Sequence, residues 1–188
     1  MNKIAIFASG NGSNAENIIA YFKKHIDIQV VAVFSNRESA GVVERAKGHN
    51  VRVFIFNRHA FLHGQVGGQL RETGANFIVL AGFLWLMPGH IIEAYPGRII
   101  NVHPALLPKY GGKGMYGARV HEAVVQNRES ETGITIHHVN DEYDAGGIIF
   151  QAACPVLPQD TPALVAEKVH ELEHQHFPRV IERLLGQW

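Results

Sequence analysis

Short continuous apolar runs alternate along this chain with segments in which apolar residues recur at helical spacing. Runs of strand length occupy residues 4–8, 28–34, 51–56, 77–81 and 99–102. Such runs are typical of strands buried on both faces, as in a parallel sheet covered by helices. The pattern therefore predicts an α/β fold with a doubly wound, mostly parallel central sheet and helices on both faces, built as a single domain over residues 1–188.

Helix signals stand between these runs and near the end of the chain. The sequence Ser-Asn-Ala-Glu at residues 13–16 matches a capping box. The helix that it opens is expected to bury the face formed by Ala15, Ile18, Ile19 and Phe22. A shorter helix is predicted around residues 42–47, and Thr161-Pro162 is expected to cap a long helix to about residue 184. The buried face of that last helix is predicted to hold Leu164, Val165, Val169 and Leu172.

The stretch over residues 104–117 is rich in glycine and proline and has no regular period. Long irregular stretches in compact domains usually carry function. Two further strands, predicted at residues 133–139 and 148–156, flank an acidic turn at 140–144. In open α/β sheets ligands bind beyond the carboxyl ends of the strands. The site is therefore expected at the turns that follow the first, fourth and fifth strands.

Composition narrows the class of ligand. The 17 basic and 17 acidic residues balance, so no long-range field would gather nucleic acid or an anionic membrane. The longest apolar run, residues 77–87, is far short of the roughly 20 residues that span a bilayer, and no secretory signal is recognised at the start. The single cysteine, Cys154, has no intrachain partner, which agrees with a reducing compartment. We expect a cytoplasmic protein with a small polar ligand and neither nucleic acid nor membrane as partner.

A glycine-rich turn, Ser-Gly-Asn-Gly-Ser-Asn at residues 9–14, joins the first strand to the first helix. Free backbone N–H groups and the positive end of a helix favour a phosphate at such a place. The turn lacks the P-loop lysine and the full G-x-G-x-x-G spacing, so neither a nucleoside triphosphatase nor a dinucleotide enzyme is indicated. Phosphate cradle and simple capped turn remain alternative interpretations.

Polar residues with catalytic potential lie at the end of the fifth strand and in the acidic turn. Asn101 and His103 are two residues apart, so on a strand both point the same way and can converge on one oxygen atom. Asp144 precedes Gly146-Gly147, whose backbone freedom allows a carboxylate to be aimed inward. A carboxylate beside His103 would favour the protonated ring and orient it. Separately, each of these residues is equally explained as a satisfied strand-end or turn residue.

Four segments together resemble the phosphoribosylglycinamide formyltransferase family in order and spacing. They are Ser-Gly-Asn-Gly-Ser-Asn at 9–14, Val-Leu-Ala-Gly-Phe at 79–83, Asn-Val-His-Pro-Ala-Leu-Leu-Pro-Lys at 101–109 and Asp-Glu-Tyr-Asp-Ala-Gly-Gly-Ile-Ile at 141–149. The resemblance runs nearly end to end and implies a Rossmann-like formyltransferase fold. It also implies transfer of the formyl group of 10-formyltetrahydrofolate to the amine of glycinamide ribonucleotide, in purine biosynthesis. No metal is implied, and we expect a monomer or weak homodimer.

The same resemblance implies roles for individual residues. The catalytic set would be Asn101, His103 and Asp144: an amide that donates to the developing oxyanion, a protonated imidazole that donates or delivers a proton, and a carboxylate that keeps the imidazole charged. The substrate's phosphate and ribose would lie against Gly12, Ser13, Asn14, His170 and Glu173. The folate would contact Leu84, Trp85, Leu86, Met87, Asn101, Asn140, Asp141, Glu142, Tyr143 and Asp144.

Some positions depart from the family's pattern. Ala105 stands where serine is usual, Gly147 where proline is common, and Trp85 where arginine is frequent. The first two change loop stiffness more than they remove a reacting group, whereas the third leaves recognition of the pterin and glutamate open. His170 stands where a polar contact to substrate is expected, and residues 61–68 match poorly and are assigned no role.

Other functions compete with this interpretation. Methionyl-tRNA formyltransferase and formyltetrahydrofolate deformylase share a similar core, but each carries an added domain for which this length leaves no room. A catalytically silent binding module with the same fold is a further alternative. His170 and His174 fit the H-E-x-x-H zinc pattern, although such a site needs a third ligand and an open cleft. His137 and His138 are interpreted as one inward and one outward strand residue rather than as metal ligands.

Overall fold

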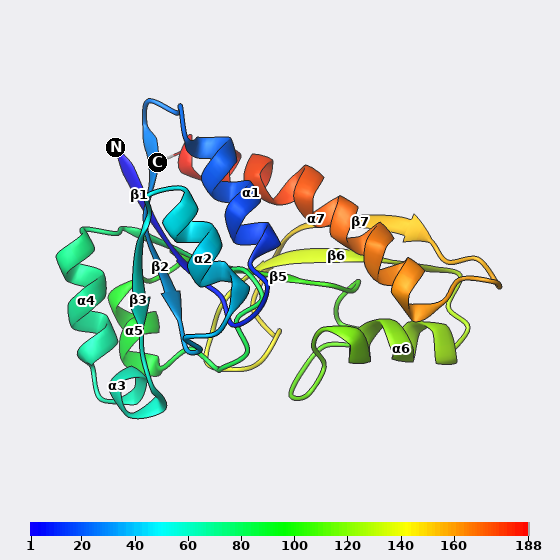
Figure 1. Ribbon diagram of the computed structural model, residues 1–188. Helices are drawn as coiled ribbons and strands as arrows, with labels where there is room; N and C mark the ends of the chain where they lie inside the picture. The colour runs from blue at the N-terminus through cyan, green and yellow to red at the C-terminus, as the bar shows by residue number, and fades with distance from the viewer. Residues whose placement is uncertain (188) are drawn as a thin grey trace.

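A seven-stranded sheet forms the centre of the molecule, with the strand order β3-β2-β1-β4-β5-β6-β7. The computed structural model describes residues 1–187 (Figure 1). Neighbouring strands from β3 to β5 are parallel, whereas β6 is antiparallel to both β5 and β7. The predicted α/β fold with a mostly parallel sheet is confirmed. The strands are β1 (Asn2–Phe7), β2 (Ile28–Ser35), β3 (Arg52–Ile55), β4 (Phe77–Leu80), β5 (Ile99–His103), β6 (Glu131–His138) and β7 (Ile148–Pro155).

Helices cover both faces of the sheet. Residues of α1, α2 and α7 pack into one core, and residues of α3, α4 and α5 pack into a second core on the opposite face (Figure 1). The helix α6 packs beside α7. The helices are α1 (Ser13–Phe22), α2 (Gly41–Gly48), α3 (Arg58–Leu62), α4 (Gln65–Thr73), α5 (Gly89–Ala94), α6 (Ala118–Gln126) and α7 (Pro162–Leu185).

Strand alternation explains why two cores form. In β1, Ile4 and Ile6 enter the core beneath α1 and α7, while Ala5 and Phe7 enter the core beneath α3 to α5. Because side chains of a strand point alternately to opposite faces, a continuous apolar run supplies both cores at once. Phe7 stacks on Phe34 with ring centroids 4.8 Å apart, so stacked aromatic rings form part of the second core.

Several local predictions need correction. Gly12 occupies the cap position of α1 and Ser13 is already helical, so the predicted Ser13 capping box is wrong. Thr161 does cap α7 as predicted, since its Oγ1 accepts from the Leu164 backbone N–H at 3.3 Å. Leu164 itself is exposed, because the buried face of α7 begins at Val165. The helices α3 to α6 were not assigned from the sequence.

The β5–β6 pair differs from the rest of the sheet because one of its faces is polar. Ile100 and Ile136 enter the core beneath α7, whereas Asn101, His103 and His137 occupy the opposite face. There the chain is covered by the irregular segment after β5 and the turn between β6 and β7 rather than by helices. Over residues 1–187, every helix falls short of the combined length and hydropathy that crossing a membrane requires.

Candidate active site

The polar face of β5 and β6 brings an amide and two imidazoles together. Asn101 and His103 alternate on β5, and Asn101 is the register partner of His137 on antiparallel β6. Directly opposed residues share a face and lie close together. The Asn101 Nδ2 and the His137 Nε2 are 3.1 Å apart. His137 is buried and His138 is less so, which agrees with the prediction of one inward and one outward residue. The sequence did not predict that His137 belongs to this cluster.

Asp144 reaches the cluster because the turn between β6 and β7 folds back on the sheet. Its φ is +55°, a left-handed conformation that aspartate adopts more readily than most residues. Gly146 lets the turn approach β6, since a Cβ added there would be 1.7 Å from the His138 carbonyl oxygen. The Asp144 Oδ2 is then 3.4 Å from His103 Nδ1, and its Oδ1 is 3.6 Å from His137 Nε2.

The carboxylate of Asp144 is held in its charged form. Burial raises the pKa of this carboxyl group, but hydrogen bonds with His103 and His137, the charge of His103 and the backbone N–H of Gly112 outweigh burial. The Gly112 N–H donates to Asp144 Oδ2 at 3.0 Å. The net result is a pKa well below the ordinary range of an aspartate. Asp144 is therefore an acceptor and a counter-charge throughout the neutral pH range.

Both nitrogens of His103 face acceptors. Its Nε2 donates to the Tyr110 carbonyl oxygen at 2.7 Å, and its Nδ1 faces Asp144 at 3.4 Å. A carbonyl and a carboxylate can only accept, so this geometry suits a ring protonated on both nitrogens. The Nδ1 contact is longer than an ordinary charge-assisted hydrogen bond, and such bonds often tighten only when substrate is bound. Of the two N–H groups of His103, the one on Nδ1 is therefore held less tightly by its acceptor.

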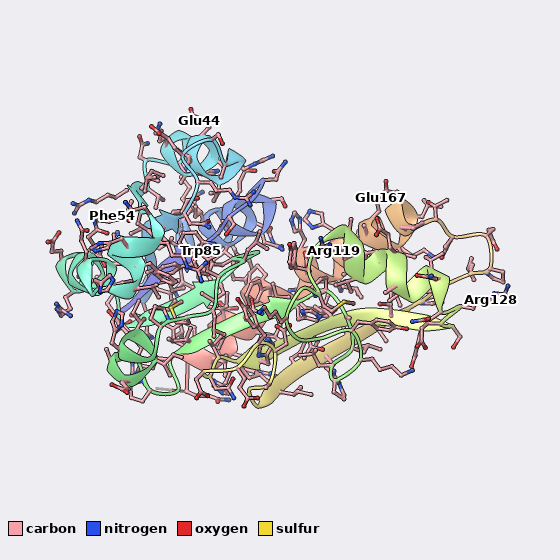
Figure 2. All side chains as sticks on the ribbon, turned by 90° about the horizontal axis from the view of Figure 1, so that it is seen from below. Glu44, Phe54, Trp85, Arg119, Arg128 and Glu167 are labelled. Atoms are coloured by element: carbon pink, nitrogen blue, oxygen red, sulfur yellow. The ribbon has the colours of Figure 1, made fainter. Side chains whose placement is uncertain are left out.

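The cluster opens into a cavity of about 830 Å³. Asn101, His103 and Asp144 all line it, so the three predicted catalytic residues share one space. The cavity is also lined by the turn after β1 and by the segment before α6. Figure 2 places Trp85 on the half of the molecule that carries α3 and α4, and Arg119 on the half that carries α6.

The glycine-rich turn after β1 forms one end of this cavity. Ser9, Gly10 and Asn14 line the cavity, whereas Gly12 and Ser13 lie beside it at the first turn of α1. Gly12 has a φ of +83°, and a Cβ there would be 2.4 Å from the Val42 Cβ, so only glycine fits. The first N–H groups of α1 have no intrahelical acceptors, and a helix start attracts anions.

Two residues of α7 face that end of the cavity. Glu173 is buried and accepts from Asn14 Nδ2 at 2.7 Å, and His170 Nδ1 is 3.3 Å from the same carboxylate oxygen. Glu173 raises the pKa of His170, although burial opposes this effect. The rings of His170 and His174 are 4.1 Å apart, so they share a helix face as the zinc pattern requires. Among residues 1–187, no three His, Cys, Asp or Glu side chains are grouped as metal ligands.

The residues expected to contact folate divide between two cavities. Leu84 and Tyr143 line the large cavity, and Trp85, Leu86 and Met87 line an adjoining cavity of about 50 Å³. Asn101, Glu142, Tyr143 and Asp144 also border this smaller space. Asn140 and Asp141 line neither, and the Asn140 Oδ1 instead accepts from the Glu142 backbone N–H.

The positions that depart from the family's pattern have distinct surroundings. Ala105 is fully buried, and its carbonyl oxygen accepts from the Thr135 hydroxyl at 2.7 Å. A Cβ at Gly147 would meet nothing within 4 Å. Trp85 packs edge-on against Phe56, and the guanidinium of Arg58 lies 5.6 Å from its ring centroid. Residues 61–68, to which the sequence assigned no role, supply Phe61 and Val66 to the core beneath α3 to α5.

The sequence of this chain is similar to sequences of known proteins. The formyl transferase family profile matches residues 2–181. Phosphoribosylglycinamide formyltransferase of Bacillus subtilis is 36% identical over 193 residues, which cover 99% of this chain and 96% of the relative. The chloroplastic phosphoribosylglycinamide formyltransferase of Arabidopsis thaliana is 38% identical over 186 residues, covering 95% of this chain and 64% of the relative.

Solved structures agree in fold. The crystal structure of phosphoribosylglycinamide formyltransferase from Bacillus halodurans superimposes with a TM-score of 0.89 at 34% identity, covering 98% of this chain and 95% of that chain. The chain spans 64% and 60% of the length of its relatives from Arabidopsis thaliana and Vigna unguiculata.

Proposed function

The chain belongs to the formyl transferase family, and from that premise we propose that it transfers the formyl group of 10-formyltetrahydrofolate to the amine of glycinamide ribonucleotide. One observation carries the proposal: Asn101, His103 and Asp144 line a single cavity that also reaches Asn14 at the start of α1, a helix start suited to a phosphate. An acyl-transfer cluster and an anion site in one space fit a phosphorylated amine acceptor.

The acceptor would lie along the large cavity. Its phosphate would bind the N–H groups at the start of α1, with Gly12, Ser13 and Asn14 in the binding turn. Its ribose hydroxyls would donate to Glu173, whose carboxylate Asn14 and His170 already hold in place. The amine would then be at the opposite end, beside Asn101 and His103. This orientation is supported by the lining of one cavity of about 830 Å³, which includes Asn14 and Glu173 as well as Asn101 and His103.

The folate would enter from the adjoining space. Leu86, Met87 and Trp85 offer apolar and aromatic surface, and the turn ending in Tyr143 and Asp144 offers polar groups beside it. A flat ring system with polar edges suits such a wall, because ligand sites are mostly apolar with a few convergent polar groups. The Arg58 guanidinium, 5.6 Å from the Trp85 ring centroid, places a positive charge beside this wall. We propose that it attracts the carboxylates of the folate's glutamate tail.

The reaction is an acyl transfer. The amine nitrogen attacks the formyl carbon and forms a C–N bond, while the formyl oxygen takes the negative charge. Asn101 Nδ2 lies 3.1 Å from His137 Nε2 and carries two hydrogens, so one of them is available for this oxygen. The Nδ1–H of His103 is the second donor, and Asp144 stabilises the charged ring. Collapse breaks the bond to the folate nitrogen. The attacking amine loses one proton and the folate nitrogen gains one, which leaves formylated glycinamide ribonucleotide and tetrahydrofolate.

Acceptor choice is the direct test of this function. Purified protein is given 10-formyltetrahydrofolate with glycinamide ribonucleotide, glycine, methionyl-tRNA or water alone, and tetrahydrofolate formation is followed spectroscopically. We expect turnover with glycinamide ribonucleotide and only background with the other three. Turnover with methionyl-tRNA or with water would assign a different reaction of the same family.

Two measurements together distinguish an enzyme from a catalytically silent binding module. Calorimetric titration with glycinamide ribonucleotide and with a non-reactive folate analogue reports binding, whereas the spectroscopic assay reports chemistry. Binding of both ligands without turnover would overturn the proposed reaction and leave the proposed sites intact.

A further inference from the structure

The imidazole of His121 is a buried polar group in the cavity wall that the proposed chemistry does not use. His121 lies in the first turn and a half of α6, is 7% exposed and lines the large cavity. Its Nδ1 is enclosed by protein and has no hydrogen-bond partner within residues 1–187. Buried polar atoms without partners are rare, so this ring needs an explanation.

Burial decides which nitrogen carries the proton. An enclosed N–H without an acceptor is rarer in proteins than an enclosed lone pair without a donor. The proton of the neutral ring is therefore expected on Nε2 rather than on the enclosed Nδ1. Because Nδ1 is sealed from the cavity, Nε2 is the polar atom through which the ring can meet a ligand. His121 then presents an N–H donor to the cavity.

The groups around His121 define what that donor can meet. Burial lowers the pKa of His121, Glu173 of α7 opposes that effect, and His103 of β5 adds to it. The ring is therefore neutral near pH 7 and lies within electrostatic reach of both the ribose-facing carboxylate and the amine-facing imidazole. The stretch of cavity between these two groups is the stretch that the substrate's glycinamide linkage must cross.

We propose that the Nε2–H of His121 donates a hydrogen bond to the carbonyl oxygen of the glycinamide linkage and so positions the substrate amine for attack. This inference rests on the proposed function. Between the ribose and the amine, the amide carbonyl is the only strong hydrogen-bond acceptor of the substrate. A donor at this point therefore recognises the glycyl portion of the ribonucleotide. His121 is a positioning residue, because it contacts substrate away from the reacting atoms.

Substitution by glutamine or asparagine distinguishes the contributions of the two ring nitrogens. The side-chain amide of glutamine reaches the place of Nε2, whereas that of asparagine reaches only the place of Nδ1. We expect His121→Asn and His121→Phe to raise both the Kd and the KM for glycinamide ribonucleotide about tenfold, the loss of one hydrogen bond. His121→Gln should stay within about threefold of wild type, and binding of a folate analogue should be unchanged in all three variants.

Nitrogen-15 NMR of the histidines gives a second readout that does not depend on turnover. We expect His121 to show the Nε2–H tautomer and its Nε2 resonance to shift when glycinamide ribonucleotide is added. Thermal unfolding and folate-analogue binding identify a variant that fails to fold. If His121→Phe fails to fold, the comparison of His121→Asn with His121→Gln tests the role of Nε2.

The outcomes distinguish this inference from the proposed function. A wild-type protein that binds no glycinamide ribonucleotide overturns the proposed function, and this inference with it. A wild-type protein that binds the ribonucleotide while all three variants bind equally well overturns the role of His121 alone. An Nδ1–H tautomer, or a glutamine variant as weak as the phenylalanine variant, does the same.

Discussion

The two sides of the sheet differ in where they carry polar side chains. On the β3–β2–β1–β4 side both faces are covered by helices, and its strands supply apolar side chains to both cores. At the proposed phosphate site, its contribution is chiefly backbone geometry, at the turn where Gly12 opens α1. On the β5–β6–β7 side one face carries Asn101, His103 and His137, and irregular chain covers it. Its contribution is side-chain chemistry.

This difference predicts separate tasks for separate parts of the fold. A turn held by close backbone packing binds an anion with little dependence on side-chain identity, whereas acyl transfer needs particular donors aimed at one oxygen. Substitutions on the parallel side should therefore change substrate binding, and substitutions on the β5–β7 side should change turnover. The following variants test that division.

The largest effect is expected for Asn101→Ala. Removing a donor to the developing oxyanion should lower kcat by about 10²–10³, with KM for either substrate little changed. Steady-state kinetics measures both constants. Asn50→Gly is the matched control, since Asn50 is exposed at the opposite edge of the sheet and its φ of +60° suits glycine. If Asn101→Ala mainly raises KM, the assignment of chemistry to this side is wrong.

A large effect is also expected for Gly146→Ala. The added Cβ would meet the His138 carbonyl oxygen, so the turn must move and carry Asp144 with it. A displacement of about 1 Å in a reacting constellation can cost about 10²-fold in rate, and overpacking costs about 1–3 kcal/mol of stability. The neighbouring Gly147→Ala, with open space around its Cβ, should behave like wild type in both assays. Equal behaviour of the two variants would show that the turn does not position Asp144.

Gly12→Ala should affect the parallel side instead. The substitution places a Cβ against Val42 at a φ of +83°, which should cost about 2–3 kcal/mol of stability. It should also displace the start of α1, and so raise KM for glycinamide ribonucleotide more than it lowers kcat. Gly48→Ala, where nothing lies within 4 Å, is the control. A fall in kcat at constant KM would contradict the proposed division of tasks.

The sequence predicted the parallel side better than the β5–β7 side for a physical reason. A strand buried on both faces leaves a continuous apolar run, which can be recognised without knowing its neighbours. The membership of His137 in the site depends on its pairing with Asn101, and that register is a long-range property. The alternation of strands predicted that one of His137 and His138 points inward, but only the antiparallel pairing of β5 and β6 shows that it is His137 and what it points toward.

The unassigned helices show the same limit in local form. The helix α4 contains Gly67-Gly68, which lowers helix propensity, yet Val66 and Leu70 are buried one turn apart. Tertiary packing therefore stabilises a helix that its own residues favour weakly. The capping box failed for a related reason, because glycine at position 12 lets the helix begin one residue earlier than the Ser13 hydroxyl would allow.

The smallest effect concerns stability rather than rate. Since the folded protein holds the pKa of Asp144 below its ordinary range, the charged carboxylate stabilises the fold above about pH 4, the unfolded value, and that contribution is lost as the pH falls. Wild type should exceed Asp144→Asn by about 1–3 kcal/mol in free energy of unfolding at pH 7, and the difference should shrink below about pH 4. Denaturant unfolding at several pH values measures it, with the exposed neighbour Asp141→Asn as control. A difference that does not change with pH would mean that His103 and His137 do not hold the carboxylate, and the β5–β7 side would lose the electrostatic feature that distinguishes it.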